Sequence, residues 1–253
     1  MLIERYRETL GKSNHGGQSL YDHTFGSVEA GLRAARLAGV RDGPQLDVML
    51  MGTAVHDVGK LDPHFQAMLE ASRDGRDLPS KRVKHEASTF DYDHPDLVGH
   101  GLLALRDEIR ACTGYAIDLD NLADRMDDVW AGAVTHHGLF YLSFEDWGDG
   151  ARPLIRRYWT SLYPNEARRI TLVDLLVDYY PIGGLVMLGD LMASYAFEQE
   201  RDLVWAFAGV ETLPQVFERL LGAAEELEIE IGAYDPRGYG LGELLRLLGG
   251  GIC

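Results

Sequence analysis

The sequence predicts an all-α protein, and three observations lead to that expectation. Apolar residues recur at three- and four-residue steps along most of the chain, which is the spacing of amphipathic helices. Alternation of apolar and polar residues, the mark of a half-buried strand, is scarce. With 253 residues and 46% hydrophobic content, the chain can bury a sizeable core. Together these features indicate a globular bundle of helices.

The first two helices are marked by both periodicity and end signals. One is expected at 24–38, with Asp22 as its N-cap and Gly39 just past its end. Its apolar face would consist of Phe25, Val28, Leu32 and Ala35. The next is expected to begin at Pro44, because proline suits a first helical turn, and to stop near Gly59. This would place the pair His56-Asp57 in its last turn.

The rest of the chain shows further helical patterns separated by loops. Helices are expected at 95–112, 119–136, 154–162, 166–180, 182–200 and 214–230. Loops are expected at 14–17, 73–79 and 146–150, and the glycine-rich segment 234–251 resembles a linker with one short helix. We therefore expect a main domain at residues 1–200 and a C-terminal helical extension at 201–253, packed on it or trailing from it.

Charge and cysteine content limit the function classes. The 40 acidic and 24 basic residues give a net charge of −16, which would repel nucleic acid unless cations or local basic segments reverse the field. A simple DNA-coating protein is therefore disfavoured. Two cysteines cannot form a disulfide framework, which favours a reducing compartment and hence the cytoplasm. The longest uncharged apolar run, 179–189, is too short to span a bilayer, so no membrane role is expected.

The pair His56-Asp57 is the strongest indication of a metal site. Adjacent residues on a helix point about 100° apart, so both can serve one cluster only from the groove between neighbouring helices. A carboxylate such as Asp57 can bind one cation through each oxygen, whereas His56 can complete only one. Taken alone, the pair has a simpler explanation as a capped helix end.

Other candidate ligands gain weight only in combination. His136-His137 closes an apolar helix, and consecutive histidines at such a place are more often ligands or acid–base groups. Asp190 interrupts an apolar stretch, where an ionised carboxylate is costly unless a metal or cation compensates it. A polar stripe on a buried helix explains Asp190 equally well. His23 and His85 stand singly and would by themselves be ordinary histidines.

As an ordered set, these residues resemble the HD superfamily of metal-dependent phosphohydrolases. The set is His23, His56-Asp57 with Gly59-Lys60, His85-Glu86 with Ser88, His136-His137-Gly138, and Asp190 with Ser194. It resembles most closely the CRISPR-associated HD nuclease, which is fused or coupled to the helicase of type I interference. The features of that narrower match are Gly11-Lys12-Ser13 ahead of Leu20, Phe65-Gln66, and the doubled histidine. The resemblance extends from about residue 12 to residue 194.

The resemblance implies an HD-domain helical bundle with a dinuclear metal site. By position, His23, His56, Asp57 and Asp190 would hold one metal, and Asp57, His85, His136 and His137 the other. Asp57 and Lys60 would act in catalysis, with Lys60 facing the substrate phosphate. Imidazole-rich ligation suits Mn, Fe, Co or Ni ions better than Mg.

The implied activity is cleavage of single-stranded DNA in type I CRISPR interference, beside a helicase and an RNA-guided surveillance complex. The chain has no Gly-x-x-x-x-Gly-Lys-Ser/Thr loop, so the motor would come from another chain or from a longer protein of which this is one domain. A basic island at 73–84, next to His85, could guide the strand; a solvated loop is the alternative. The expected nucleic-acid contacts are Lys12, Lys81, Arg82 and Lys84.

Two other functions remain open at this point. One is an HD phosphohydrolase acting on nucleotides, which would need a closed pocket for a base. The other is a scaffold whose core binds metal only for structure, which is disfavoured because every ligand position of the motif is filled.

Overall fold

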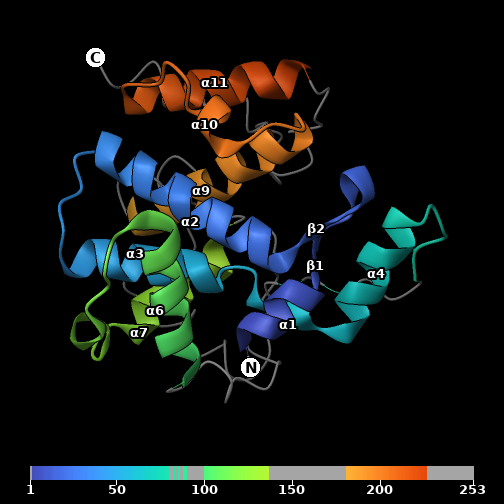
Figure 1. Cartoon of the computed structure of the whole chain (residues 1–253), viewed down its shortest axis with the longest axis horizontal. Coiled ribbons are helices and arrows are strands. Elements are labelled where there is room, and N and C mark those ends of the chain that lie inside the picture. Colours follow the sequence, from blue (N-terminus) through green and yellow to red (C-terminus); the bar gives the residue numbers. More distant parts are fainter. Residues whose placement is uncertain are drawn as a thin grey trace, which may run out of the picture.

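The structure is a computed structural model that describes residues 2–79, 83, 85, 88–89, 100–136 and 181–226. Within these ranges it is helical, apart from one short antiparallel hairpin (Figure 1). The prediction of an all-α fold is confirmed. In this part of the chain, every helix is too short or too polar to cross a bilayer.

The N-terminal segment forms a helix and the hairpin. Helix α1 (Leu2–Glu8) leads into β1 (Leu10–Lys12), and β1 pairs with β2 (Gln18–Ser19) across the short helix η1 (Asn14–Gly16). Helix α1 was not predicted from the sequence, and a loop was expected where η1 lies.

Helix α2 (Leu20–Leu37) follows β2 directly. Ser19 is its N-cap, because the Ser19 hydroxyl accepts a hydrogen bond from the amide of Asp22. The predicted start at residue 24, with Asp22 as the cap, is therefore wrong by one turn.

Helix α3 (Pro44–Val55) is the central helix of the bundle. It begins at Pro44 as predicted, and every residue from 46 to 55 is buried, because α2, α6, α7 and α9 surround it (Figure 1). It ends at Val55, earlier than expected. His56 and Asp57 therefore lie in the turn between α3 and the short helix η2 (Val58–Leu61), not in the last turn of an α-helix.

Helix α4 (Pro63–Arg73) was not predicted, although its start carries two clear signals. The Asp62 carboxylate accepts hydrogen bonds from the amides of His64 and Phe65, and Pro63 occupies the first turn. In Figure 1, α4 lies beside the hairpin at one end of the bundle. The predicted loop at 73–79 begins where this helix ends.

Helix α6 (His100–Thr113) precedes a segment that was predicted as one helix at 119–136. That segment contains two helices, η4 (Leu119–Leu122) and α7 (Met126–Thr135). Asp118 caps η4, and Arg125, with φ −126° and ψ 15°, is outside the helical region and separates η4 from α7.

The C-terminal described elements are α9 (Pro181–Glu198), the short α10 (Leu203–Ala206) and α11 (Leu213–Glu226). Helix α9 confirms the helix predicted at 182–200, and both α10 and α11 contact α9. The division at residue 200 stays a prediction. The expected elements at 154–162, 166–180, 146–150 and 234–251 lie outside the described residues.

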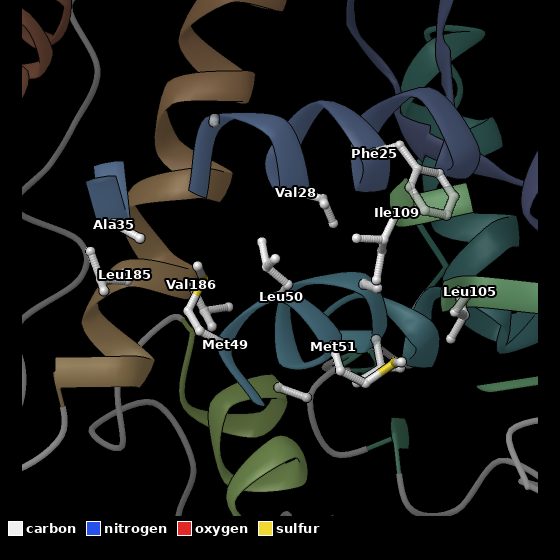
Figure 2. Close-up of a cluster of buried hydrophobic side chains, with 14 of the residues drawn as sticks. Phe25, Val28, Ala35, Met49, Leu50, Met51, Leu105, Ile109, Leu185 and Val186 are labelled. Atoms are coloured by element: carbon white, nitrogen blue, oxygen red, sulfur yellow. The ribbon is translucent and has the colours of Figure 1, made fainter. Parts of the chain in front are cut away.

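The core lies between α2, α3, α6 and α9 (Figure 2). Its labelled side chains are Phe25, Val28, Ala35, Met49, Leu50, Met51, Leu105, Ile109, Leu185 and Val186. Helices α2 and α9 approach so closely that a Cβ on Gly189 would lie 2.6 Å from the carbonyl oxygen of Ser27. This contact brings the next residue, Asp190, against α2.

Candidate metal centre

Six of the seven predicted ligands converge on one buried site, from four helices and the connections between them. They are His23, His56, Asp57, His85, His136 and Asp190, and none is more than 7% exposed. Asp190 comes from α9, and His23 comes from the part of α2 that faces it. His137 lies outside the described residues.

His56 and His136 are held in the same way. Each follows the last residue of a helix, α3 or α7, and its ring Nδ1 contacts the carbonyl oxygen three residues earlier, that of Thr53 (2.6 Å) or Ala133. A carbonyl oxygen only accepts, so Nδ1 carries the proton and Nε2 presents a lone pair. This is the usual support of a metal-binding histidine.

Asp57 lies at the middle of the cluster, and its oxygen Oδ2 faces one group of side chains. The His23 Nε2 atom lies 3.0 Å from Oδ2, and the His56 Nε2 atom lies 3.3 Å from it. The Asp190 Oδ1 atom lies 3.0 Å from His23 Nε2 and 3.9 Å from His56 Nε2. Asp190 therefore belongs to the Oδ2 side.

The other oxygen, Asp57 Oδ1, faces His85 and His136. Their Nε2 atoms lie 3.0 Å and 3.6 Å from Oδ1, and 3.3 Å from each other. The His85 ring packs edge-on against the ring of Phe65, with the ring centroids 4.9 Å apart. The His85 backbone lies against η2 so closely that a Cβ on Gly59 would collide with the carbonyl oxygen of His85. The requirement for glycine at position 59 thus follows from this backbone contact.

The hydrogen bonding of the cluster fits a metal centre. Seven buried side-chain nitrogen or oxygen atoms in the described residues have no hydrogen-bond partner, and five belong to His23, His56 and Asp57. Buried polar atoms are normally paired, so their concentration here calls for a ligand. Two triplets of donor atoms, each within 4.8 Å, suit a cation: His23, His56 and Asp190, and His56, Asp57 and His136.

The protonation states also suit metal binding. Burial by itself raises the pKa of Asp57, but His56 and Lys60 outweigh that effect and hold the pKa well below its usual range. Burial also raises the pKa of Asp190, but Lys12 and His23 outweigh that effect, and this pKa also lies well below its usual range. Burial lowers the pKa of His23, and Lys12 adds to the effect. Ionised carboxylates beside a neutral imidazole are the states that bind a cation.

Lys60 faces the cluster rather than solvent. Its Nζ atom lies 2.6 Å from Asp57 Oδ2 and donates a hydrogen bond to the carbonyl oxygen of Gly11 (3.1 Å). Because η2 is a 3-10 helix, Lys60 is one turn after Asp57 rather than after His56. Its role in catalysis stays a prediction.

The basic residues predicted to contact nucleic acid are placed only in part. Lys12, on β1, is half-buried, and its charge interacts with Asp190. Arg73 and Arg76 of the basic island both form ion pairs with Asp74 on the surface. The other expected contacts, Lys81, Arg82 and Lys84, lie outside the described residues.

Two residues that support the site were not assigned this role from the sequence. The buried hydroxyl of Tyr6 donates to the carbonyl oxygen of Ala54 (3.2 Å), in the last turn of α3 before His56. The Gln66 side chain bonds the backbone of both Leu10 and Lys60. In the sequence, Gln66 was noted only as part of the Phe65-Gln66 motif. The only sequence signal for α1, which carries Tyr6, is the spacing of Leu2, Ile3 and Tyr6.

Comparison with known proteins identifies the family. No curated protein and no solved structure matches the chain. A family model described as the HD domain of Cas3 matches residues 16–212, which include all six gathered side chains and most of the chain. The chain therefore belongs to the Cas3 HD-domain family, the CRISPR-associated nucleases of HD type, which are metal-dependent hydrolases.

Proposed function

We propose that this protein is a nuclease that hydrolyses single-stranded DNA with two bound divalent cations. The observation that supports this most directly is the position of Asp57, whose two oxygens face two different groups of imidazoles. His23, His56 and Asp190 would hold one cation with Asp57 Oδ2. His85 and His136, with His137 by its sequence position, would hold the other with Asp57 Oδ1.

The metals would be transition ions. Imidazole is the main donor in both proposed sets, and it suits Mn, Fe, Co or Ni better than Mg, which prefers oxygen ligands and water. Bound divalent cations supply the Lewis acidity that activates water and offsets charge on a phosphate.

The charges that the chain itself contributes support a phosphate substrate. The carboxylates of Asp57 and Asp190 are each faced by a lysine, Lys60 and Lys12, which offset their negative charge. Each divalent cation would then make the site net positive, although the whole chain carries −16. This local reversal removes the objection that an acidic protein repels DNA.

The form of the substrate follows from the burial of the cluster. Ligands that are at most 7% exposed can be reached by a flexible single strand more readily than by a rigid duplex. Duplex DNA would have to be opened first by a helicase, as a separate chain or a further domain, recruited by an RNA-guided surveillance complex. We place this activity in type I CRISPR interference in the cytoplasm.

The test combines elemental analysis of the purified protein with hydrolysis assays across Mn²⁺, Fe²⁺, Co²⁺, Ni²⁺ and Mg²⁺. We expect about two metals per chain and degradation of single-stranded DNA, with blunt duplex left largely intact and the rate falling as salt rises. His23→Ala should abolish this activity, whereas His64→Ala, which removes an exposed histidine on α4, should not.

The alternatives predict different results. Turnover of free nucleotides with inert DNA would favour a nucleotide phosphohydrolase. Metal-loaded protein that hydrolyses no phosphate ester would favour a structural metal. Rapid cleavage of blunt duplex without a helicase would contradict the substrate that we propose.

A further inference from the structure

We propose that Gln66 is a positioning residue that holds the two lysines of the metal centre in place for a substrate phosphate. This inference rests on the proposed function and extends it to a residue outside the cluster. Gln66 lies on α4, and Lys12 and Lys60 come from β1 and η2. Its side-chain amide joins all three elements.

Both ends of the Gln66 amide are used. Its Oε1 accepts a hydrogen bond from the amide of Leu10 (3.0 Å), and its Nε2 donates to the carbonyl oxygens of Leu10 (3.0 Å) and Lys60 (2.7 Å). The side chain thus pairs with the outer edge of β1 as a neighbouring strand would, and it also fixes the backbone of η2.

These bonds close a ring that includes the metal centre. Gln66 holds the backbone of Lys60, and the Lys60 ammonium reaches both Asp57 Oδ2 and the carbonyl oxygen of Gly11. Gly11 follows Leu10, which Gln66 also holds. The hairpin and the turn that carries Asp57 therefore cannot shift independently of each other while these bonds persist.

The hairpin needs such support because it is very small. Its strands have three and two residues, and an isolated hairpin is marginal even when it is longer. Another side-chain contact with α4, between the hydroxyls of Ser13 and Ser72 (3.2 Å), is exposed. Lys12 lies on β1 two residues after Leu10, and its half-buried charge interacts with Asp190. Loss of the Gln66 bonds would loosen the α4 side of β1, the strand that carries Lys12 and Gly11.

The experiment compares Gln66→Met with Gln215→Met. Met keeps the length of the side chain and removes the amide. Gln215 is the matched control, because its side chain also bonds the backbone: its Oε1 accepts from the amides of Glu211 and Thr212, at the start of α11 and away from the site. A purely structural contribution would affect both variants in stability alone.

For Gln66→Met we expect unchanged metal content and a KM for single-stranded DNA that rises about tenfold, as is typical when a supporting partner is removed. The dependence of binding on salt should weaken, by about 0.7 in the logarithmic slope for each phosphate that a lysine no longer neutralises. In a Lys60→Met background the Gln66 substitution should have a smaller effect, because the two share one network. Gln215→Met should change none of these values.

Two further measurements keep the inference separate from the proposed function. Gln66→Glu keeps the acceptor for the amide of Leu10 but replaces the Nε2 donor by an acceptor, so it should raise the KM as Gln66→Met does. The amide of Leu10 should exchange hydrogen faster in Gln66→Met, which lacks the acceptor, than in Gln66→Glu. If the wild type hydrolyses DNA and Gln66→Met matches it in KM and salt slope, the positioning role is wrong and the nuclease stands. If the wild type binds single-stranded DNA through Gln66-dependent contacts without hydrolysing it, positioning stands and the nuclease fails. Absence of both binding and hydrolysis would overturn both.

Discussion

Two carboxylates stand near the two ends of helix α3, and both are buried to 1% exposure. Asp47, in the first turn, accepts hydrogen bonds from the hydroxyl of Tyr115 and from the Asn121 side-chain amide, each at 2.6 Å. Asp57, just past the last turn, is faced on Oδ2 by the Lys60 ammonium at 2.6 Å and on both oxygens by imidazole Nε2 atoms. One helix therefore presents one buried carboxylate that neutral donors satisfy and one that lies among an ammonium and imidazoles.

The difference lies in the type of neighbour. Asp47 is surrounded by neutral donors on one segment after α6, and the bond from Tyr115, added to burial, raises the pKa of that phenol to about 12. Asp57 faces the Nε2 atoms of imidazoles, and at least those of His56 and His136 present lone pairs. Burial of a carboxylate thus does not identify a functional site by itself. The neighbours decide whether it fastens elements together or binds a cation.

The comparison predicts its largest effect for Asp57→Ala. A ligand shared by two cations cannot be lost from one site only, so this variant should lose both metals and more than about 100-fold in activity, beyond what loss of a supporting residue costs. Helical content should persist. Near-normal metal occupancy would contradict the shared role of Asp57.

Asp190→Asn should affect one cation. The change keeps size and polarity but removes the charge, so the affinity for the cation on the Oδ2 side should fall about tenfold or more, while the other stays bound. Melting temperatures with chelator and with Mn²⁺ separate ligation from a structural role. A stability loss confined to the metal-loaded protein supports ligation, and an equal loss in both states defeats it.

The candidate ligands were selected from the sequence as an ordered set, because His23 and His85 do not stand out by themselves. Asp190 interrupts an apolar helix and His56-Asp57 follows a buried one, and their order along the chain with the other histidines gave the resemblance that selected them. Their grouping around the two oxygens of Asp57 depends on how α2 and α9 pack, which the close contact at Gly189 sets.

The support of the site was harder to predict because it depends on short elements and long-range bonds. Helix α1 has seven residues, too few for a clear periodicity, yet it carries Tyr6. Asp62 and Pro63 signal the start of α4, and Phe65, Met68 and Leu69 recur at helical steps, yet the helix was not predicted; it buries little, since Ala71 is its one buried residue. The bonds from Gln66 to Leu10 span 56 residues, and no local pattern encodes them.

Asp47→Asn should show the opposite pattern to the changes at the metal centre. An asparagine oxygen can still accept from one partner, so one hydrogen bond is lost and the free energy of unfolding should fall by about 1 kcal/mol. Metal content and activity should not change, because the two ends of α3 are roughly 15 Å apart and effects at that distance are largely independent. Calorimetry with metal analysis checks this, and a loss of metal would mean that the two ends are coupled.

The smallest effect is expected for Ser194→Ala. The Ser194 hydroxyl donates to Asp190 Oδ1 (3.2 Å) from one turn further along α9, and so it orients a proposed ligand without itself joining the cluster. A hydrogen bond of this kind contributes about 0.5–1 kcal/mol, so metal affinity should fall roughly two- to fivefold.

Ser27→Ala is the matched control. The Ser27 hydroxyl donates to the backbone carbonyl of His23 (2.8 Å), within the same pair of helices but not to a ligand side chain. Titration with Mn²⁺ should therefore distinguish Ser194→Ala from wild type and not Ser27→Ala. Equal losses in both variants would mean that packing of α2 on α9, rather than the bond to Asp190, sets the affinity.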